Sequence, residues 1–271
     1  MLTIDWKERF TLDTEDYLKN KLPNGDYDFE IIFNAYPERV NGKVPSRVIT
    51  YVSGVIVSRL GRKHADYLPF YRHLWFEKGE NGKLAFAAIL SKLIHKKPNV
   101  YFPLLEDTFE DSNSTQINAL LDRVMLPHLR KHPDKYLDRV LLWTRSENED
   151  LAWAATNLCL KFIKRREDLI DEVLHSLLNQ WAYPLGELQS LHVMFLKTIA
   201  KLSKESYLAV WEEFGITRDP QIVELLAASV TDYHPTIEPI VESWTKSGNA
   251  RVKKAGTSAY RIVKRKKGAK A

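Results

Sequence analysis

Residues 143–148 of this 271-residue chain read Trp-Thr-Arg-Ser-Glu-Asn, and residues 244–249 read Trp-Thr-Lys-Ser-Gly-Asn. Each stretch precedes a helical pattern with two small residues, Ala154-Ala155 and Ala255-Gly256, and every matched position is 101 residues apart. We interpret the tryptophan as the end of one helix that packs on the next. The serine and asparagine then offer side-chain acceptors to the N–H groups that open the next helix.

Helical periodicity recurs along the whole chain, whereas the alternation typical of strands is almost absent. Apolar residues recur at i, i+3, i+4 and i+7 over 82–96, 114–130 and 148–166. Short proline-marked breaks separate such segments, and connections of about two to eight residues favour antiparallel neighbours. The repeat spacing equals about two to three HEAT-type helix pairs. The sequence therefore predicts an all-α, HEAT-like α-solenoid of antiparallel helix pairs.

We expect a single array over residues 1–271. It comprises an N-terminal cap (1–26), helix-pair repeats (27–248) and a basic C-terminal helix and tail (249–271). No apolar run approaches the roughly 20 residues that span a bilayer, and the first residues lack a signal-peptide pattern. Cys159 is the only cysteine, so no intrachain disulfide can form. These features predict a cytoplasmic protein with no membrane partner.

The net charge of +5 is unevenly distributed. Residues 249–271 carry nine Lys and Arg and no acid, whereas the remaining 248 residues carry 31 basic and 35 acidic groups, a net of −4. One stripe of the C-terminal helix consists of Lys254, Ser258, Arg261 and Arg265. Cations in one helical row can replace the counterions of a nucleic-acid backbone. A solvated terminal helix is the alternative reading.

Residues 70–215 resemble the bacterial alkylpurine DNA glycosylases built from HEAT-like alkylation repeats. The resemblance is carried by Leu74-Trp75, 83–94, 103–106, 126–136 and the Trp143, Ser146, Asn148, Leu151, Ala154-Ala155 phrase, which matches the family's W-x-x-S-x-N helix entry. It implies a right-handed, C-shaped superhelix whose concave, basic face holds a DNA duplex.

The resemblance also implies three functional residues in that concave groove. An aspartate stabilises the developing sugar cation, an aromatic ring favours the cationic base, and an arginine contacts phosphate. The matching positions here are Asn118, Ser114 and Trp153. Asparagine is neutral and cannot supply the anion. A one-turn shift of the alignment offers Asp122, which shares a helix stripe with Ser114 and Asn118.

A second stripe contains Trp153, Asn157, Lys161 and Lys164. An aromatic ring within a basic stripe can stack on a base or sugar while lysines hold phosphate. Packing of Trp153 against an adjacent repeat is the alternative. Together with Lys254, Arg261, Lys264 and Arg265, these residues are our predicted DNA contacts.

The sequence predicts neither a metal site nor a cofactor. His128 and His132 are four residues apart, but nothing nearby completes a ligand set, and the flanking prolines Pro127 and Pro133 suggest a helix end. No phosphate-binding glycine loop or hydrolase signature is present. We expect Cys159 to be an inert core residue.

The sequence therefore favours a non-enzymatic protein that binds duplex or distorted DNA, mainly through phosphates. One alternative is an active N-glycosylase for cationic alkylpurines that uses Asp122. A second is a protein-interaction scaffold, supported by the net charge of −4 over residues 1–248.

Overall fold

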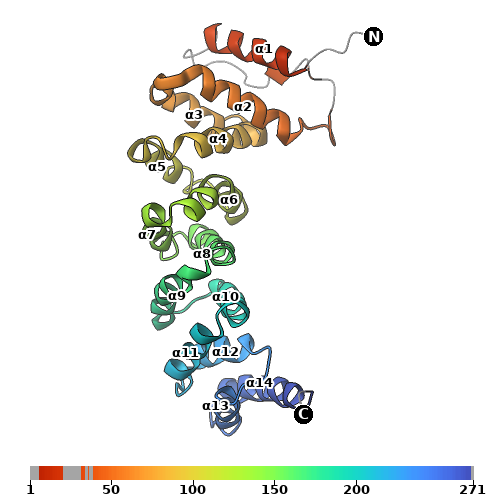
Figure 1. Ribbon diagram of the computed structural model, residues 1–271, viewed down its shortest axis with the longest axis vertical. Coiled ribbons are helices and arrows are strands. Elements are labelled where there is room, and N and C mark those ends of the chain that lie inside the picture. Colours follow the sequence, from red (N-terminus) through yellow and green to blue (C-terminus); the bar gives the residue numbers. More distant parts are fainter. Residues whose placement is uncertain (1–5, 21–31, 34–35, 37–38, 270–271) are drawn as a thin grey trace. The chain divides into compact units, whose positions relative to one another are not determined.

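The protein is all-helical over the residues that its computed structural model describes, which are 6–20, 32–33, 36 and 39–269 (Figure 1). These ranges contain no strand, only an isolated bridge between Val40 and Lys43. The predicted all-α class is confirmed. Within the predicted cap, residues 1–5 and 21–26 lie outside the described residues, as do 270–271 of the predicted tail. None of the described helices is both long and apolar enough to cross a membrane.

The chain divides into two compact units, Met1–His128 and Leu129–Ala271. The continuity of one array from residue 1 to 271 stays a prediction. In unit 1, α2 packs against α1 and α4, and α4 packs against α3 and α5. Its helices are α1 (Trp6–Asn20), α2 (Ser46–Leu60), α3 (Leu68–Phe76), α4 (Gly79–Leu93), α5 (Pro98–Glu106) and most of α6 (Ser114–Lys131).

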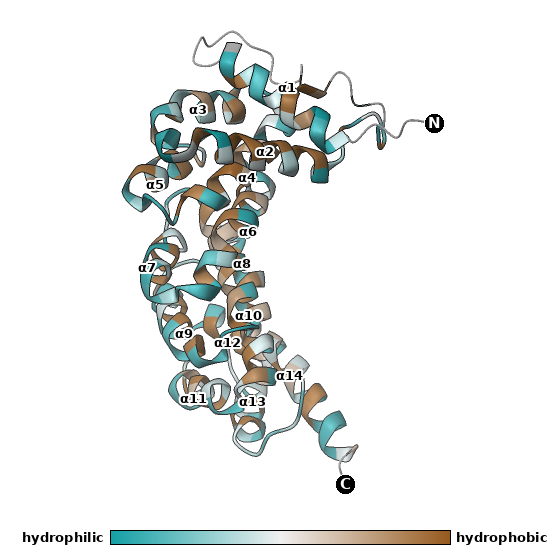
Figure 2. Ribbon diagram, turned by 45° about the horizontal axis from the view of Figure 1, so that its top comes forward, coloured by the Kyte–Doolittle hydropathy of each residue, from teal (hydrophilic) through white to brown (hydrophobic). Residues whose placement is uncertain are grey.

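Unit 2 has two layers of helices. In one layer α10 packs between α8 and α12, and α12 packs on α14; α7, α9, α11 and α13 form the other layer, as Figure 2 shows. We call these the even and odd layers. The helices are α7 (Pro133–Trp143), α8 (Glu149–Ile163), α9 (Ile170–Leu178), α10 (Leu188–Leu202), α11 (Lys204–Phe214), α12 (Pro220–Ser229), α13 (Ile237–Thr245) and α14 (Ala250–Gly268).

The predicted helices over 114–130 and 148–166 correspond to α6 and α8, whereas the one predicted over 82–96 runs three residues earlier at both ends. Its early start depends on glycine. Gly79 adopts a φ of +54° at the turn out of α3, and a Cβ at Gly82 would lie 2.2 Å from the carbonyl oxygen of Leu74. One proline was misread: Pro127 does not mark a helix end, because α6 continues through it to Lys131.

The repeated phrase opens α8 and α14 as predicted. Asn148 accepts a hydrogen bond from the Leu151 N–H at 3.0 Å, and Asn249 accepts one from the Arg251 N–H at 2.9 Å. The preceding serines, Ser146 and Ser247, accept from the asparagine N–H groups at 3.1 and 3.2 Å. Each hydrogen bond satisfies a donor that the helix itself leaves without a partner. The predicted capping role is confirmed.

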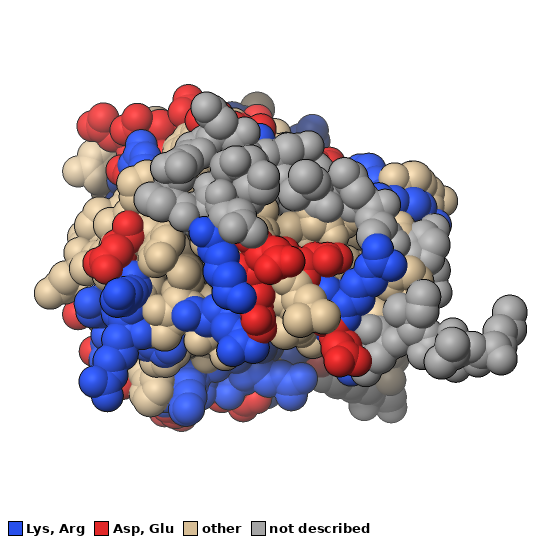
Figure 3. Space-filling view, turned by 90° about the horizontal axis from the view of Figure 1, so that it is seen from above, with Lys and Arg blue, Asp and Glu red and all other residues tan. Residues whose placement is uncertain are grey.

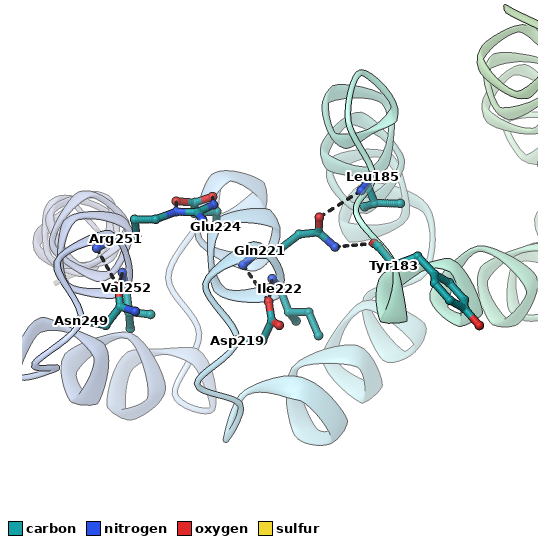
Figure 4. Close-up of polar contacts among 9 residues, drawn as sticks. All are labelled: Tyr183, Leu185, Asp219, Gln221, Ile222, Glu224, Asn249, Arg251 and Val252. Atoms are coloured by element: carbon teal, nitrogen blue, oxygen red, sulfur yellow. Dashed lines mark hydrogen bonds and ion pairs between the residues drawn. The ribbon is translucent and has the colours of Figure 1, made fainter. Parts of the chain in front are cut away.

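A third helix entry of the same type escaped the sequence comparison. Asp219 caps α12 by accepting from the Gln221 and Ile222 N–H groups (Figure 4). The Thr217 hydroxyl in turn accepts from the Asp219 N–H at 3.2 Å. Here threonine replaces serine, aspartate replaces asparagine, and the buried Trp211 lies farther upstream. The hydrogen-bonding pattern is therefore retained although the letters of the phrase are not.

Replacing Asn249 by alanine should lower the free energy of unfolding by about 1 kcal/mol, because two N–H groups of α14 lose their acceptor. Urea denaturation measures the change. Asn249→Asp is the matched control: it keeps the acceptor, adds a negative charge at the helix N-terminus and should stay close to the parent. Equal losses in both variants would contradict the capping role.

Candidate nucleic-acid interface

The α14 helix has one buried row and one fully solvent-facing row. Its buried residues Val252, Gly256, Ala259 and Val263 lie on the side that packs against α12 and α13. The opposite side carries a row of exposed cations, which we call the α14 row: Lys254, Arg261 and Arg265. No acid occurs on this helix, and these three residues form no ion pair within the part of the chain that the structure describes.

The flanks of α14 carry cations that are matched by glutamates. Arg251 contacts Glu224 of α12 at 2.7 Å, which holds the pKa of that carboxyl below its usual value (Figure 4). Lys267 and Lys264 contact Glu238 of α13 at 2.6 and 3.0 Å and likewise lower the pKa of its carboxyl. Lys264 was among the predicted DNA contacts. Because Glu238 balances its charge, we leave it out of the interface proposed below.

The α8 helix is buried on all but one stripe. Within residues 151–163 only Trp153, Asn157 and Lys161 are not buried, and Lys164 is exposed just beyond them. The side chain of Trp153 is half-buried, so its ring combines a packed part with an accessible part. The predicted stripe is therefore the solvent-facing surface of α8. This stripe and the α14 row belong to the same layer, and the helices α10 and α12 lie between them.

Charge is segregated between the two layers of unit 2. The even helices α8, α10, α12 and α14 carry eleven Lys and Arg against three Asp and Glu. The odd helices α7, α9, α11 and α13 carry three Lys and Arg against nine Asp and Glu. The whole excess of cations in the even layer comes from α14, because α8, α10 and α12 together carry three Lys and three Asp and Glu. The acidic residues of the unit 2 helices therefore lie mainly on the odd layer.

Unit 1 contains the positions that correspond to the catalytic groups of the resembled family. Ser114, Asn118 and Asp122 occupy successive turns of α6, and the Asn118 amide donates a hydrogen bond to Asp122 at 3.4 Å. Asp122 also lines a cavity of about 500 Å³ together with Trp75 and Arg123. A carboxylate, an aromatic ring and a guanidinium therefore meet at this cavity, although only the carboxylate was singled out from the sequence.

The aromatic ring of this cavity is already occupied by a cation. The ammonium of Lys83 lies over the indole of Trp75, 5.0 Å from the ring centre, and Trp75 is only 3% exposed. A cationic base entering the cavity would meet the positive charges of Lys83 and Arg123 as well as the carboxylates of Asp122 and Glu80. This electrostatic mixture is less favourable for a cation than an acidic pocket with an open aromatic face.

The remaining candidate side chains have structural partners. His128 lies with its Nε2 2.7 Å from the Ser91 carbonyl oxygen, and its ring stacks on His95. Cys159 is fully buried in α8, which raises the pKa of its thiol to about 12. The predicted burial of Cys159 in the core is confirmed. A thiol of this kind is a poor nucleophile at neutral pH.

Comparisons with protein-family models, with curated proteins and with solved structures found no match to this chain. The charges and cavities of the chain itself are therefore the basis on which its function is inferred.

Several basic residues of the candidate surface were missed from the sequence. On α10, Lys197 and Lys201 lie four residues apart in a helix without acids, and this spacing was available as a signal. In unit 1, Arg47 and Lys92 come from helices α2 and α4 and line the same cleft. Their proximity had no sequence signal, because 45 residues separate them.

The even layer contains a buried histidine, His192, and protonation of its imidazole should destabilise the folded protein. Trp181 donates a hydrogen bond to Nδ1 of His192 on α10 at 3.0 Å, and burial lowers the pKa of His192 to about 4. In the unfolded chain the imidazole gains a proton near pH 6.5, so the unfolded state binds more protons between about pH 6.5 and 4.

We predict that the free energy of unfolding falls by roughly 3 kcal/mol as the pH is lowered across this window. Urea denaturation at several pH values, compared between the parent and His192→Gln, isolates this contribution from that of the carboxylates. His175→Gln, an exposed histidine of α9, is the control and should follow the parent. A parallel pH dependence in His192→Gln and the parent would contradict the assignment.

Proposed function

We propose that this protein is a HEAT-like helical-repeat protein that binds duplex or distorted DNA through phosphate contacts and does not excise bases. The α14 row is the observation that carries the proposal. Its three cations face solvent, have no ion-pair partner among the described residues and lie on a helix without acids. Such cations gain most from contact with a polyanion, since they release its condensed counterions.

The length of the α14 row along its helix is comparable to the width of a nucleic-acid groove. Lys254 and Arg265 are eleven residues apart, which is about 16 Å along a helix. The major groove of B-DNA is about 12 Å wide. The row is thus long enough to contact phosphates on both sides of a groove. Contacts of this kind fix position without reading sequence, so we expect weak sequence preference.

The rest of the even layer supports the same partner. Lys161 and Lys164 of α8 and Lys197 and Lys201 of α10 extend the basic surface, and Trp153 supplies a ring on which a base or sugar can stack. The net acidity that favoured a protein scaffold gathers on the odd layer. Within residues 1–248 the even helices are balanced, with three Lys and three Asp and Glu, so the basic excess of this layer is that of α14.

The right-handed, concave superhelix implied by the resemblance is part of this proposal. Two layers of alternating helices in unit 2 and three matched helix entries support a repeat architecture. In such an architecture each repeat buries its apolar face against its neighbours, and the surface of one layer becomes an extended binding face.

Replacing Lys254 and Arg261 by glutamine should weaken duplex binding and reduce the slope of log K against log salt by about two, because two phosphate contacts disappear. Fluorescence anisotropy with a labelled duplex at several salt concentrations measures both quantities. The matched control is Lys135→Gln/Lys204→Gln, which removes the same charge from exposed positions of the odd layer.

The proposal fails if the control loses as much affinity as the α14 variant, or if parent affinity is insensitive to salt. Point substitutions are preferable to deletion of residues 249–271. Deletion would expose Trp244 and the rest of the surface on which α14 packs.

An active N-glycosylase is the second candidate, favoured by the cavity that brings Asp122, Trp75 and Arg123 together. A carboxylate beside the sugar would stabilise the cation that forms as the base departs. Because the cavity also holds Lys83 over the Trp75 ring, we predict no release of methylated base from treated duplex, even at high protein concentration. Base release that disappears in Asp122→Asn would establish the second candidate in place of the first.

A further inference from the structure

A cleft of about 640 Å³ lies in unit 1, far along the sequence from the α14 row. We call it the α2 cleft. It is lined by Thr11 of α1, by Arg47, Thr50, Tyr51, Gly54, Val55, Ser58 and Arg59 of α2, and by Lys92 of α4. Figure 3 views the molecule from the α1 end, where exposed Lys and Arg side chains are interspersed with Asp and Glu side chains.

Among the described residues, the lining of the α2 cleft has three cations and four hydroxyl groups and no carboxylate. Arg59 is balanced from outside by an ion pair with Glu15 of α1. At the rim, the guanidinium of Arg123 donates to the Thr50 hydroxyl, which brings a fourth cation to the edge. The Thr11 and Tyr51 hydroxyls are hydrogen-bonded to each other at 3.0 Å. The Thr11 and Tyr51 hydroxyls also donate to the backbone carbonyl oxygen of Lys7, and the Thr50 hydroxyl donates to that of Ser46. The lining therefore offers a net positive charge, and its cations are the main donors to an incoming anion.

Lys92 is the cation of the cleft without an internal partner. Its side chain is exposed, and it forms no ion pair or hydrogen bond within the described part of the chain. Its ammonium lies close to the middle of α2: a Cβ added at Gly54 would be 2.9 Å from the Lys92 Nζ. An exposed ammonium at this position is available to an anion that enters the cleft from solvent.

Gly54 has no packing role that would explain it. A Cβ at Gly82 would meet the backbone of Leu74, and one at Gly215 would meet the backbone of Trp211, so both glycines permit close helix contacts. At Gly54 the added Cβ would meet only the flexible end of Lys92. Glycine is unfavourable inside a helix. The absence of a side chain here keeps the floor of the cleft open.

We propose that the α2 cleft binds a phosphate group. Arginine and lysine side chains can donate to a tetrahedral oxyanion from several directions, whereas a carboxylate has only two oxygens to offer. The volume of the cleft is much larger than a phosphate ion needs. The phosphate therefore belongs to a larger molecule, either the backbone of a nucleic acid or a small phosphorylated metabolite.

The first experiment uses inorganic phosphate and the full-length protein. Titration at constant ionic strength, with chloride as the balancing anion, is followed by the amide resonance of residue 54 and by calorimetry. We expect saturable binding to the parent and about 10-fold weaker binding to Lys92→Gln, which loses one charge-assisted hydrogen bond. Lys63→Gln removes an exposed lysine of the same unit outside the cleft and should bind as the parent does.

A second variant separates binding from folding. Gly54→Leu should raise the melting temperature, because leucine is a far better helix former than glycine, and should abolish phosphate binding by filling the cleft. Increased stability together with lost binding is not the outcome of a merely structural role for Gly54.

Two further ligands identify the source of the phosphate. If a 12-base-pair duplex without terminal phosphates binds more weakly to Gly54→Leu while the α14 row is intact, the phosphate belongs to the nucleic-acid backbone. If Gly54→Leu loses the binding of adenosine monophosphate but binds the duplex as the parent does, the ligand is a small phosphorylated molecule. Both outcomes support the site. Failure of the α14 variants to affect duplex binding leaves this inference intact.

The proposal is overturned if phosphate shifts no resonance near Gly54 beyond the effect of chloride. It is overturned equally if Lys92→Gln and Lys63→Gln lose phosphate affinity to the same extent, because binding would then be non-specific attraction to positive charge.

Discussion

The chemistry of unit 2 depends on one constraint: each helix of the even layer buries an apolar face against its neighbours and leaves its polar residues on the side that faces solvent. On α8 that side is only as wide as the stripe of Trp153, Asn157 and Lys161. Helix entries capped by Asn148, Asp219 and Asn249 fix where the buried faces begin. Rotation of a helix about its axis would expose apolar side chains, so burial decides which polar residues reach the surface.

This constraint sorts the charges of unit 2 into a polarised surface. Cations gather on the even helices and acids on the odd helices, although the two kinds alternate along the chain. On α14 the separation goes further, because Glu224 and Glu238 balance its flanks while the outward row has no ion pair among the described residues. A surface with this separation attracts polyanions that the net charge alone would not suggest.

The α2 cleft and the Asp122 cavity of unit 1 differ in a way that matters for chemistry. The described lining of the α2 cleft has cations and hydroxyls without a carboxylate, so it is suited to holding an anion. The Asp122 cavity mixes carboxylates with Lys83 and Arg123 and places a cation over its aromatic ring. Binding of phosphate needs only the first kind of environment. Cleavage of a glycosidic bond needs an anion that is not already balanced.

The sequence alone determined the helical class, the approximate extent of α4, α6 and α8 and the caps of α8 and α14, because periodicity and cap chemistry are local properties. It also identified the stripes of α8 and α14, since residues on one helix face follow from a period of 3.6. The tertiary structure decided everything that requires two helices. It paired Lys264 with Glu238, assembled Arg47 with Lys92, put Trp75 beside Asp122 and sorted charge between layers. Such contacts depend on which helices become neighbours, and no local pattern encodes that choice.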